Sequence, residues 1–153
     1  MNSISKFALV PYSPSEMFSL VDNVPAYREF LPWCSDSKEM KRDPDEVHAS
    51  IEINKGAFRK SFSTCNRLQQ NKMIEMRLKE GPFKHLEGFW RFDALGEKGC
   101  KVSLDLQFEF SSRILQMTVG PIFHQIANSL VDAFCSRAET RTTNCRKNRI
   151  CRT

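Results

Sequence analysis

The side chains best suited to chemistry in this sequence are its cysteines and histidines. They are Cys34, Cys65, Cys100, Cys135, Cys145 and Cys151, with His48, His85 and His124. The cysteines form no Cys-x-x-Cys pair, and no group of cysteines and histidines has zinc-finger spacing, so the sequence predicts no metal site. Because the N-terminus lacks a recognisable secretion signal, we expect reduced thiols and a cytoplasmic protein.

Enzymatic signatures are also missing from the sequence. It contains no Gly-x-Ser-x-Gly, His-Glu-x-x-His, P-loop or dinucleotide-binding glycine pattern. The three histidines are scattered, and His48 falls on the polar side of an alternating segment, which is typical of a solvated residue. We therefore predict a protein that is not an enzyme, with no catalytic residues and no required cofactor.

The net charge of +5 belongs to the C-terminal end of the chain. Residues 137–153 hold six basic residues and one acidic residue, whereas residues 1–136 hold 17 of each sign. A neutral body argues against a domain shaped to wrap nucleic acid, and no DNA partner is expected. Residues 141–153 lack an apolar period, so we expect a basic, disordered or frayed tail. Such a tail is suited to peripheral contact with anionic lipid at the inner membrane.

Alternation of apolar and polar residues dominates the middle of the chain. The clearest example runs from Cys100 to Phe110, where every second residue is apolar. Such alternation predicts half-buried antiparallel strands. The other expected strands cover residues 3–10, 38–42, 46–53, 58–64, 74–79 and 86–93. Glycine, asparagine and proline between these segments supply turn residues, so the strands should follow one another as hairpins.

Helices are expected at both ends of this series of strands. Ser13, Pro14 and Glu16 form a helix start with Ser13 as the cap, and a second short helix is expected over 25–31. Residues 112–140 carry apolar residues at every third or fourth position, which predicts a long amphipathic helix. A kink or break is expected within it at Gly120-Pro121, because proline lacks the amide donor.

These elements predict an α+β fold in one domain, residues 1–140. A curved antiparallel sheet of six or seven strands has one apolar face, and the long C-terminal helix is the element able to cover it. The chain has twelve phenylalanines but only two tyrosines and two tryptophans. Because phenylalanine carries no polar group, this composition favours a dry interior or an apolar ligand site.

The order of elements and several motifs resemble the helix-grip fold of START-like domains, the SRPBCC superfamily. The motifs are ALVPYS at 8–13, YREFLP at 27–32, GPFK at 81–84 continuing to Phe92, and FEF at 108–110 before the long helix. The chain is similar to a bacterial branch that contains coenzyme Q-binding proteins and the ribosome association toxin. The resemblance covers about residues 3–140.

The resemblance implies two functions that differ in kind. The first is non-enzymatic binding of ubiquinone or a polyprenyl-quinone-like lipid in an apolar cavity, in support of respiration. The second is binding to the large (50S) ribosomal subunit, so that 70S ribosomes do not form. A lesser alternative is a cyclase or dehydratase, which the wider superfamily also contains. The first is the leading hypothesis here and the second is a close alternative.

Each hypothesis has its own candidate residues. Burial of an apolar tail stabilises by roughly 25 cal/mol per Å², so a ligand site should use the inward phase of the strands and the apolar side of the helix. Its candidates are Ile51, Phe62, Met76, Trp90, Phe92, Leu104, Leu106, Phe108, Met117, Phe123, Ile126 and Leu130, with Met117 near the kink as a gate. Ribosome contact needs basic side chains, because phosphate neutralisation dominates affinity for RNA. The candidates for that contact are Lys41, Arg42, Arg59, Lys60, Lys79 and Lys84.

Overall fold

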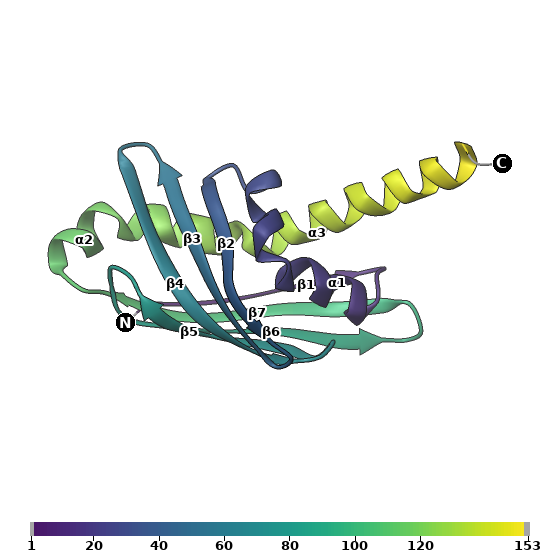
Figure 1. The fold of residues 1–153 in the computed structure, drawn as a ribbon, viewed down its shortest axis with the longest axis horizontal. Coiled ribbons are helices and arrows are strands. Elements are labelled where there is room, and N and C mark those ends of the chain that lie inside the picture. The colour runs from purple at the N-terminus through teal and green to yellow at the C-terminus, as the bar shows by residue number, and fades with distance from the viewer. Residues whose placement is uncertain (1, 152–153) are drawn as a thin grey trace.

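The computed structural model describes the backbone of residues 2–151 and the side chains of residues 2–141. Seven strands form one antiparallel sheet in the order β1-β7-β6-β5-β4-β3-β2 (Figure 1). The strands are β1 (Asn2–Val10), β2 (Cys34–Asp43), β3 (Glu46–Lys55), β4 (Phe58–Gln69), β5 (Met73–Glu80), β6 (Phe83–Leu95) and β7 (Gly99–Phe110). Strands β2 to β7 follow one another as hairpins, as the alternation predicts, and β1 pairs with β7 at the far edge.

Three of the predicted turns hold a residue in the left-handed α conformation. Gly56, Asn71 and Gly96 each have a φ of 62°. Glycine adopts this conformation without a steric penalty and asparagine tolerates it. These turns fix the register of the hairpins, and therefore which side chains face each other on neighbouring strands.

The described part of the chain has four helices. They are α1 (Pro14–Asp22), the 3-10 helix η1 (Val24–Glu29), α2 (Arg113–Thr118) and α3 (Gly120–Cys151). The Ser13 hydroxyl accepts a hydrogen bond from the backbone N–H of Glu16 at 3.1 Å, so Ser13 caps α1 as predicted. Ser112 caps α2 in the same way through the N–H of Leu115, at 3.2 Å.

The predicted long helix is two helices in the structure. The expected break falls at Val119, directly before Gly120-Pro121, where proline removes an amide donor. α3 then continues to Cys151, so the backbone of the expected disordered tail is helical, because no glycine or proline follows Pro121 and arginine and lysine are good helix formers. The side chains of residues 142–153 lie outside the described ones, and the domain boundary at residue 140 stays a prediction. Among the described residues, no helix is both long and apolar enough to cross a membrane.

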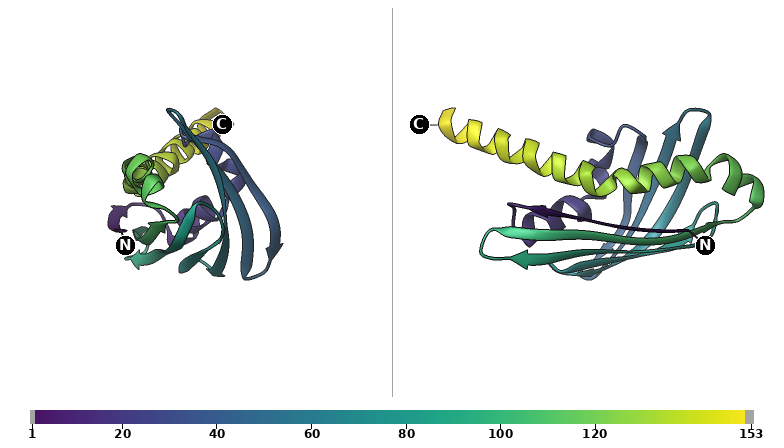
Figure 2. Two further views of the ribbon diagram at one scale, coloured as in Figure 1. Left: turned by 90° about the vertical axis from the view of Figure 1, so that its left-hand side faces the viewer. Right: turned by 180° about the vertical axis from the view of Figure 1, so that it is seen from behind.

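α3 lies along the concave face of the sheet, and its C-terminal part projects beyond the strands (Figure 1). The two further views show β2, β3 and β4 curving up beside this helix (Figure 2). The predicted α+β architecture, a curved sheet that grips a C-terminal helix, is therefore confirmed.

Aromatic clusters hold the two ends of the helix–sheet interface. Phe134, on the later part of α3, makes edge-to-face contacts with Tyr27, Phe30 and Trp90, with ring centroids 5.2–5.3 Å apart. Near the start of α3, Phe123 packs against a second group of rings, which are Phe62, Phe83, Phe108 and Phe110. Half of the twelve phenylalanines therefore take part in contacts between α3 and the sheet.

The two edge strands of the sheet are protected in different ways. β1 lies beside α3, and Lys6 Nζ is 3.9 Å from Asp132 Oδ2 on that helix. β2 contacts η1 and has two irregularities along its pairing with β3. Residues 38–43 of β2 are charged except for Met40. Charges and bulges of this kind are common on the exposed edges of natural sheets.

We predict that Phe134→Ala lowers the free energy of unfolding by about 3–5 kcal/mol, because it opens a cavity in a ring cluster where Phe134 is 1% exposed. Urea denaturation followed by circular dichroism measures the change. Met117→Ala is the matched control, because Met117 is 78% exposed and its loss should cost at most about 0.5 kcal/mol. Equal losses for the two variants would show that α3 is not held by these ring contacts.

Candidate functional site

A cavity lies between α3 and the concave face of the sheet. The volume of this cavity is about 80 Å³. Small residues face it from both sides, with Ala49 on β3 and Ala127 on α3. Because neither side chain reaches across the gap, the helix and the sheet leave a space where larger residues would fill the core.

Eight of the twelve predicted ligand residues line this cavity. They are Ile51, Phe62, Met76, Trp90, Leu106, Phe123, Ile126 and Leu130. Gly88 lies on the same face of β6, and a Cβ atom there would come within 2.9 Å of Leu106 Cδ1 and of Met76 Cε. Glycine at this position therefore lets these two lining side chains approach the backbone of β6.

The other four predicted ligand residues lie outside the cavity lining. Phe92 and Leu104 are buried in the cluster that also contains residues of α1, which covers that end of the sheet. Phe108 packs edge-on against Phe123, with ring centroids 4.7 Å apart. Met117 is 78% exposed on α2, because it is two residues from the partly buried Leu115 and therefore lies on the opposite side of that helix. The prediction of Met117 as a gate to the cavity finds no support in this position.

A buried polar pair interrupts the apolar cavity wall. The Thr64 hydroxyl donates a hydrogen bond to Asn66 Oδ1 at 2.8 Å, and both residues line the cavity from β4. They share a face because they are two residues apart on one strand. A hydroxyl and an amide in an apolar pocket are suited to orienting a ligand that carries a carbonyl or hydroxyl group. Sequence reasoning missed Asn66, although it continues the inward phase of Phe62 and Thr64.

Aromatic residues between α1 and β2 complete the lining. Tyr27 and Trp33 face the cavity from this segment, which sequence reasoning did not assign to the site. The Tyr27 hydroxyl donates a hydrogen bond to the backbone oxygen of Val21. Burial, together with the negative charge of Asp22, raises the pKa of Tyr27 well above its ordinary value. The phenol therefore stays protonated. The signal that could have identified Tyr27 is its place in the motif at 27–32.

Five of the six predicted ribosome-contact residues divide into two groups, those with ion pairs and those without. Lys41, Arg42 and Arg59 each form ion pairs with acidic residues of the same fold, so much of their charge is balanced locally. Lys60 and Lys84 are exposed and have no ion pair among the described residues. These two lie near the beginnings of β4 and β6, which are at the same end of an antiparallel sheet.

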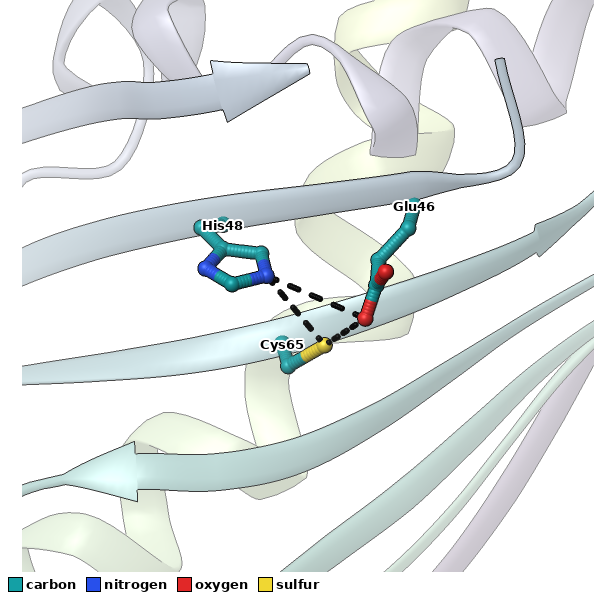
Figure 3. Close-up of side chains that lie close together, drawn as sticks. All are labelled: Glu46, His48 and Cys65. Carbon is teal, nitrogen blue, oxygen red and sulfur yellow. Dashed lines mark hydrogen bonds and ion pairs between the residues drawn. The ribbon is translucent and has the colours of Figure 1, made fainter. Parts of the chain in front are cut away.

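The outer face of the sheet carries a separate cluster of three polar side chains, shown in Figure 3. Glu46, His48 and Cys65 place one carboxylate oxygen, one imidazole nitrogen and one sulfur within 4.8 Å of one another. The last of the predicted ribosome residues, Lys79, places its Nζ 2.9 Å from His48 Nδ1. Burial and the Glu46 carboxylate raise the pKa of the Cys65 thiol, so the thiol is a hydrogen-bond donor to that carboxylate. Sequence reasoning predicted no metal site, because spacing along the chain does not show this group.

A curved antiparallel sheet that grips a helix around an apolar cavity defines a helix-grip protein. The chain belongs to the family described as polyketide cyclase/dehydrase and lipid transport, which matches residues 10–135. A solved START superfamily protein from Mycobacterium smegmatis has the same fold, with a TM-score of 0.76 at 20% identity over 90% of this chain and 97% of that one. The predicted resemblance to START-like domains is confirmed.

Two curated relatives represent the two functions that the resemblance implied. The chain is 45% identical over 136 residues to the ribosome association toxin RatA of Pseudomonas aeruginosa, which covers 89% of this chain and 94% of that protein. It is 25% identical over 142 residues to the mitochondrial coenzyme Q-binding protein coq10 of Schizosaccharomyces pombe, over 87% of this chain and 84% of that protein. Neither relative carries the name of an enzyme, whereas the family as a whole includes cyclases.

We predict that Thr64→Val lowers the free energy of unfolding by about 1–3 kcal/mol, because it leaves the buried Asn66 Oδ1 without its donor. Replacing both partners by apolar residues, in Thr64→Val/Asn66→Leu, should recover most of the loss. A double-mutant cycle by urea denaturation, with Asn66→Leu as the fourth protein, measures the coupling. If the two single losses simply add, the pair does not act as a unit in the cavity wall.

Proposed function

We propose that this protein associates with the ribosome through the large subunit and prevents the subunits from joining. The observation that carries the proposal is 45% identity over 94% of a protein named as a ribosome association toxin. The sequence alone placed ligand binding first, and the extent of this identity supports the reverse order. The proposed function needs a cytoplasmic location and includes no catalytic step and no required cofactor.

The contact surface in this proposal is the end of the sheet that carries Lys60 and Lys84. Residues 1–136 have no net formal charge, so within this part of the chain contact with RNA must come from local groups of basic side chains. Lys60 and Lys84 meet this need better than Lys41, Arg42 and Arg59, because the latter three are paired with acidic residues of the fold.

We predict that Lys60→Glu/Lys84→Glu weakens binding to purified 50S subunits at least tenfold at low salt and lowers the slope of log affinity against log salt by about 2. Sedimentation of the protein with 50S subunits over a salt series measures both quantities, with 30S subunits in parallel. Lys41→Glu on β2 is the control and should bind like the wild type. Failure of the wild type to sediment with 50S subunits would remove the proposal, and wild-type binding by the double variant would remove this surface from it.

The cavity supports a second function, the binding of an apolar ligand without chemical change. Its lining is apolar apart from a few polar groups, of which Thr64 and Asn66 form a hydrogen-bonded pair. Burial of apolar ligand surface supplies affinity and a few placed polar groups supply orientation. The relationship to a coenzyme Q-binding protein supports a quinone or a related lipid as the ligand. Both functions can coexist, because the cavity is inside the domain and Lys60 and Lys84 are on its surface.

We predict that a short-chain ubiquinone analogue quenches the tryptophan fluorescence of the protein. The chain has two tryptophans, Trp33 and Trp90, and both line the cavity. Ala127→Leu should weaken the affinity for the analogue at least tenfold, because the larger side chain occupies the cavity. Met117→Leu on the exposed side of α2 should leave the affinity unchanged. Melting curves confirm that both variants are folded. Saturable quenching that is the same in Ala127→Leu as in the wild type would place the quinone elsewhere.

A further inference from the structure

The outer face of β3 and β4 holds a group of side chains that neither proposed function uses. Glu46 and His48 are two residues apart on β3 and therefore point to the same side of the sheet. Cys65 on β4 lies directly opposite His48 in the antiparallel register. All three side chains are half-buried, and they point toward one another in Figure 3.

We propose that Glu46, His48 and Cys65 form a binding site for Zn²⁺, with a water molecule as the fourth ligand. Thiolate sulfur, imidazole nitrogen and carboxylate oxygen are the ligands that zinc takes in proteins. Three protein ligands leave one tetrahedral position open, and the partial exposure of the group lets water reach it. None of these three ligands lines the cavity or belongs to the proposed ribosome contact at Lys60 and Lys84.

The separations of the three ligand atoms are close to those of a tetrahedral site. At zinc–ligand bonds of roughly 2.0–2.3 Å, neighbouring ligand atoms lie about 3.5 Å apart. Cys65 Sγ is 3.7 Å from His48 Nε2, and His48 Nε2 is 3.8 Å from Glu46 Oε1. Cys65 Sγ is only 2.7 Å from Glu46 Oε1, because the thiol donates a hydrogen bond to the carboxylate. That pair must open by about 1 Å when the thiol releases its proton to solvent and the metal takes its place.

Lys79 affects which ring nitrogen of His48 carries the proton, and zinc binding needs Nε2 without one. Its Nζ lies 2.9 Å from His48 Nδ1, the ring nitrogen that faces away from Cys65. An ammonium group can only donate, so a neutral His48 in this contact carries its proton on Nε2, which is the nitrogen that zinc would need. Zinc binding therefore requires the ring proton to move to Nδ1 and Lys79 to turn away into solvent, which its exposed side chain allows.

Other charged groups beside the site also bear on its affinity. Arg67 lies opposite Glu46 in the register of β3 and β4, and Arg77 lies opposite Cys65 in the register of β4 and β5. Arg67 and Lys79 favour the carboxylate and the thiolate but oppose a divalent cation, whereas Arg77 is paired with Glu75 and Glu87. We therefore expect the affinity of the wild type to be limited by these cations, and removal of Lys79 to raise it.

The test uses Co²⁺ as a probe, because a cysteine thiolate bound to this ion gives a charge-transfer band in the near ultraviolet. The full chain is prepared as Cys145→Ser/Cys151→Ser, so that thiols of the tail do not contribute. We expect one Co²⁺ per chain with this band, and its loss when Zn²⁺ is added in equal amount. Cys135→Ser, at another half-buried cysteine, is the control and should keep the band.

Variants of the site separate the proposal from non-specific metal binding. In the same background, Cys65→Ser should abolish the thiolate band, and His48→Gln and Glu46→Gln should each weaken Co²⁺ binding at least tenfold. Lys79→Met should strengthen binding several-fold, which a simple loss of structure would not produce. The proposal is overturned if the background protein shows no thiolate band, or if the band persists in Cys65→Ser. Melting curves without metal confirm that the variants are folded.

Discussion

The packing of α3 on the concave face of the sheet is the interaction on which the other features of this protein depend. A single layer of seven strands has an apolar inner face that must be kept from water, and α3 is the long helix that covers it. Phe123 and Phe134 fasten the helix to the sheet near two points along its length. Ala127 lies between these points and is too small to reach the strands. The cavity therefore lies where small side chains face each other, Ala127 on α3 and Ala49 on β3.

The strands beneath the helix serve two surfaces at once, because neighbouring residues of a strand point to opposite sides of the sheet. In β4, Thr64 and Asn66 face the cavity, whereas Cys65 between them faces outward beside His48. The backbone of one strand is all that separates the cavity wall from the outer face. Surface contact and internal ligand binding can in this way be carried by the same few strands.

Much of the fold could be predicted from the sequence, because alternation and turn residues are local signals. The strand expected from Cys100 to Phe110 differs from β7 by a single residue, and the candidates taken from the inward phase include five of the ten residues that the strands supply to the cavity lining. Asn66 was missed because a polar residue in the inward phase interrupts the pattern. Contacts across strands could not be predicted, since the pairing of His48 with Cys65 depends on a register that the turn at Gly56 sets in three dimensions.

One part of the helical prediction, the assignment of Met117 to the cavity, is not supported by the structure. Met117 is two residues from Leu115 and from Val119, so it lies on the side of the helix opposite the apolar one and is exposed. The charge pattern was also incomplete as a guide. It identified Arg42 and Arg59 as basic candidates without showing that Asp22 and Glu52 form ion pairs with them in the folded chain.

The two edges of the sheet restrict the ways in which this protein can meet a partner. β1 is flanked by α3, and β2 is irregular, charged and partly covered by η1. Neither edge offers the long, regular row of backbone donors and acceptors that a foreign strand would need to extend the sheet. Self-association into continuous β-structure is disfavoured for the same reason. Recognition of this protein must then depend on side chains, which single substitutions can alter without disturbing the backbone pairing of the sheet.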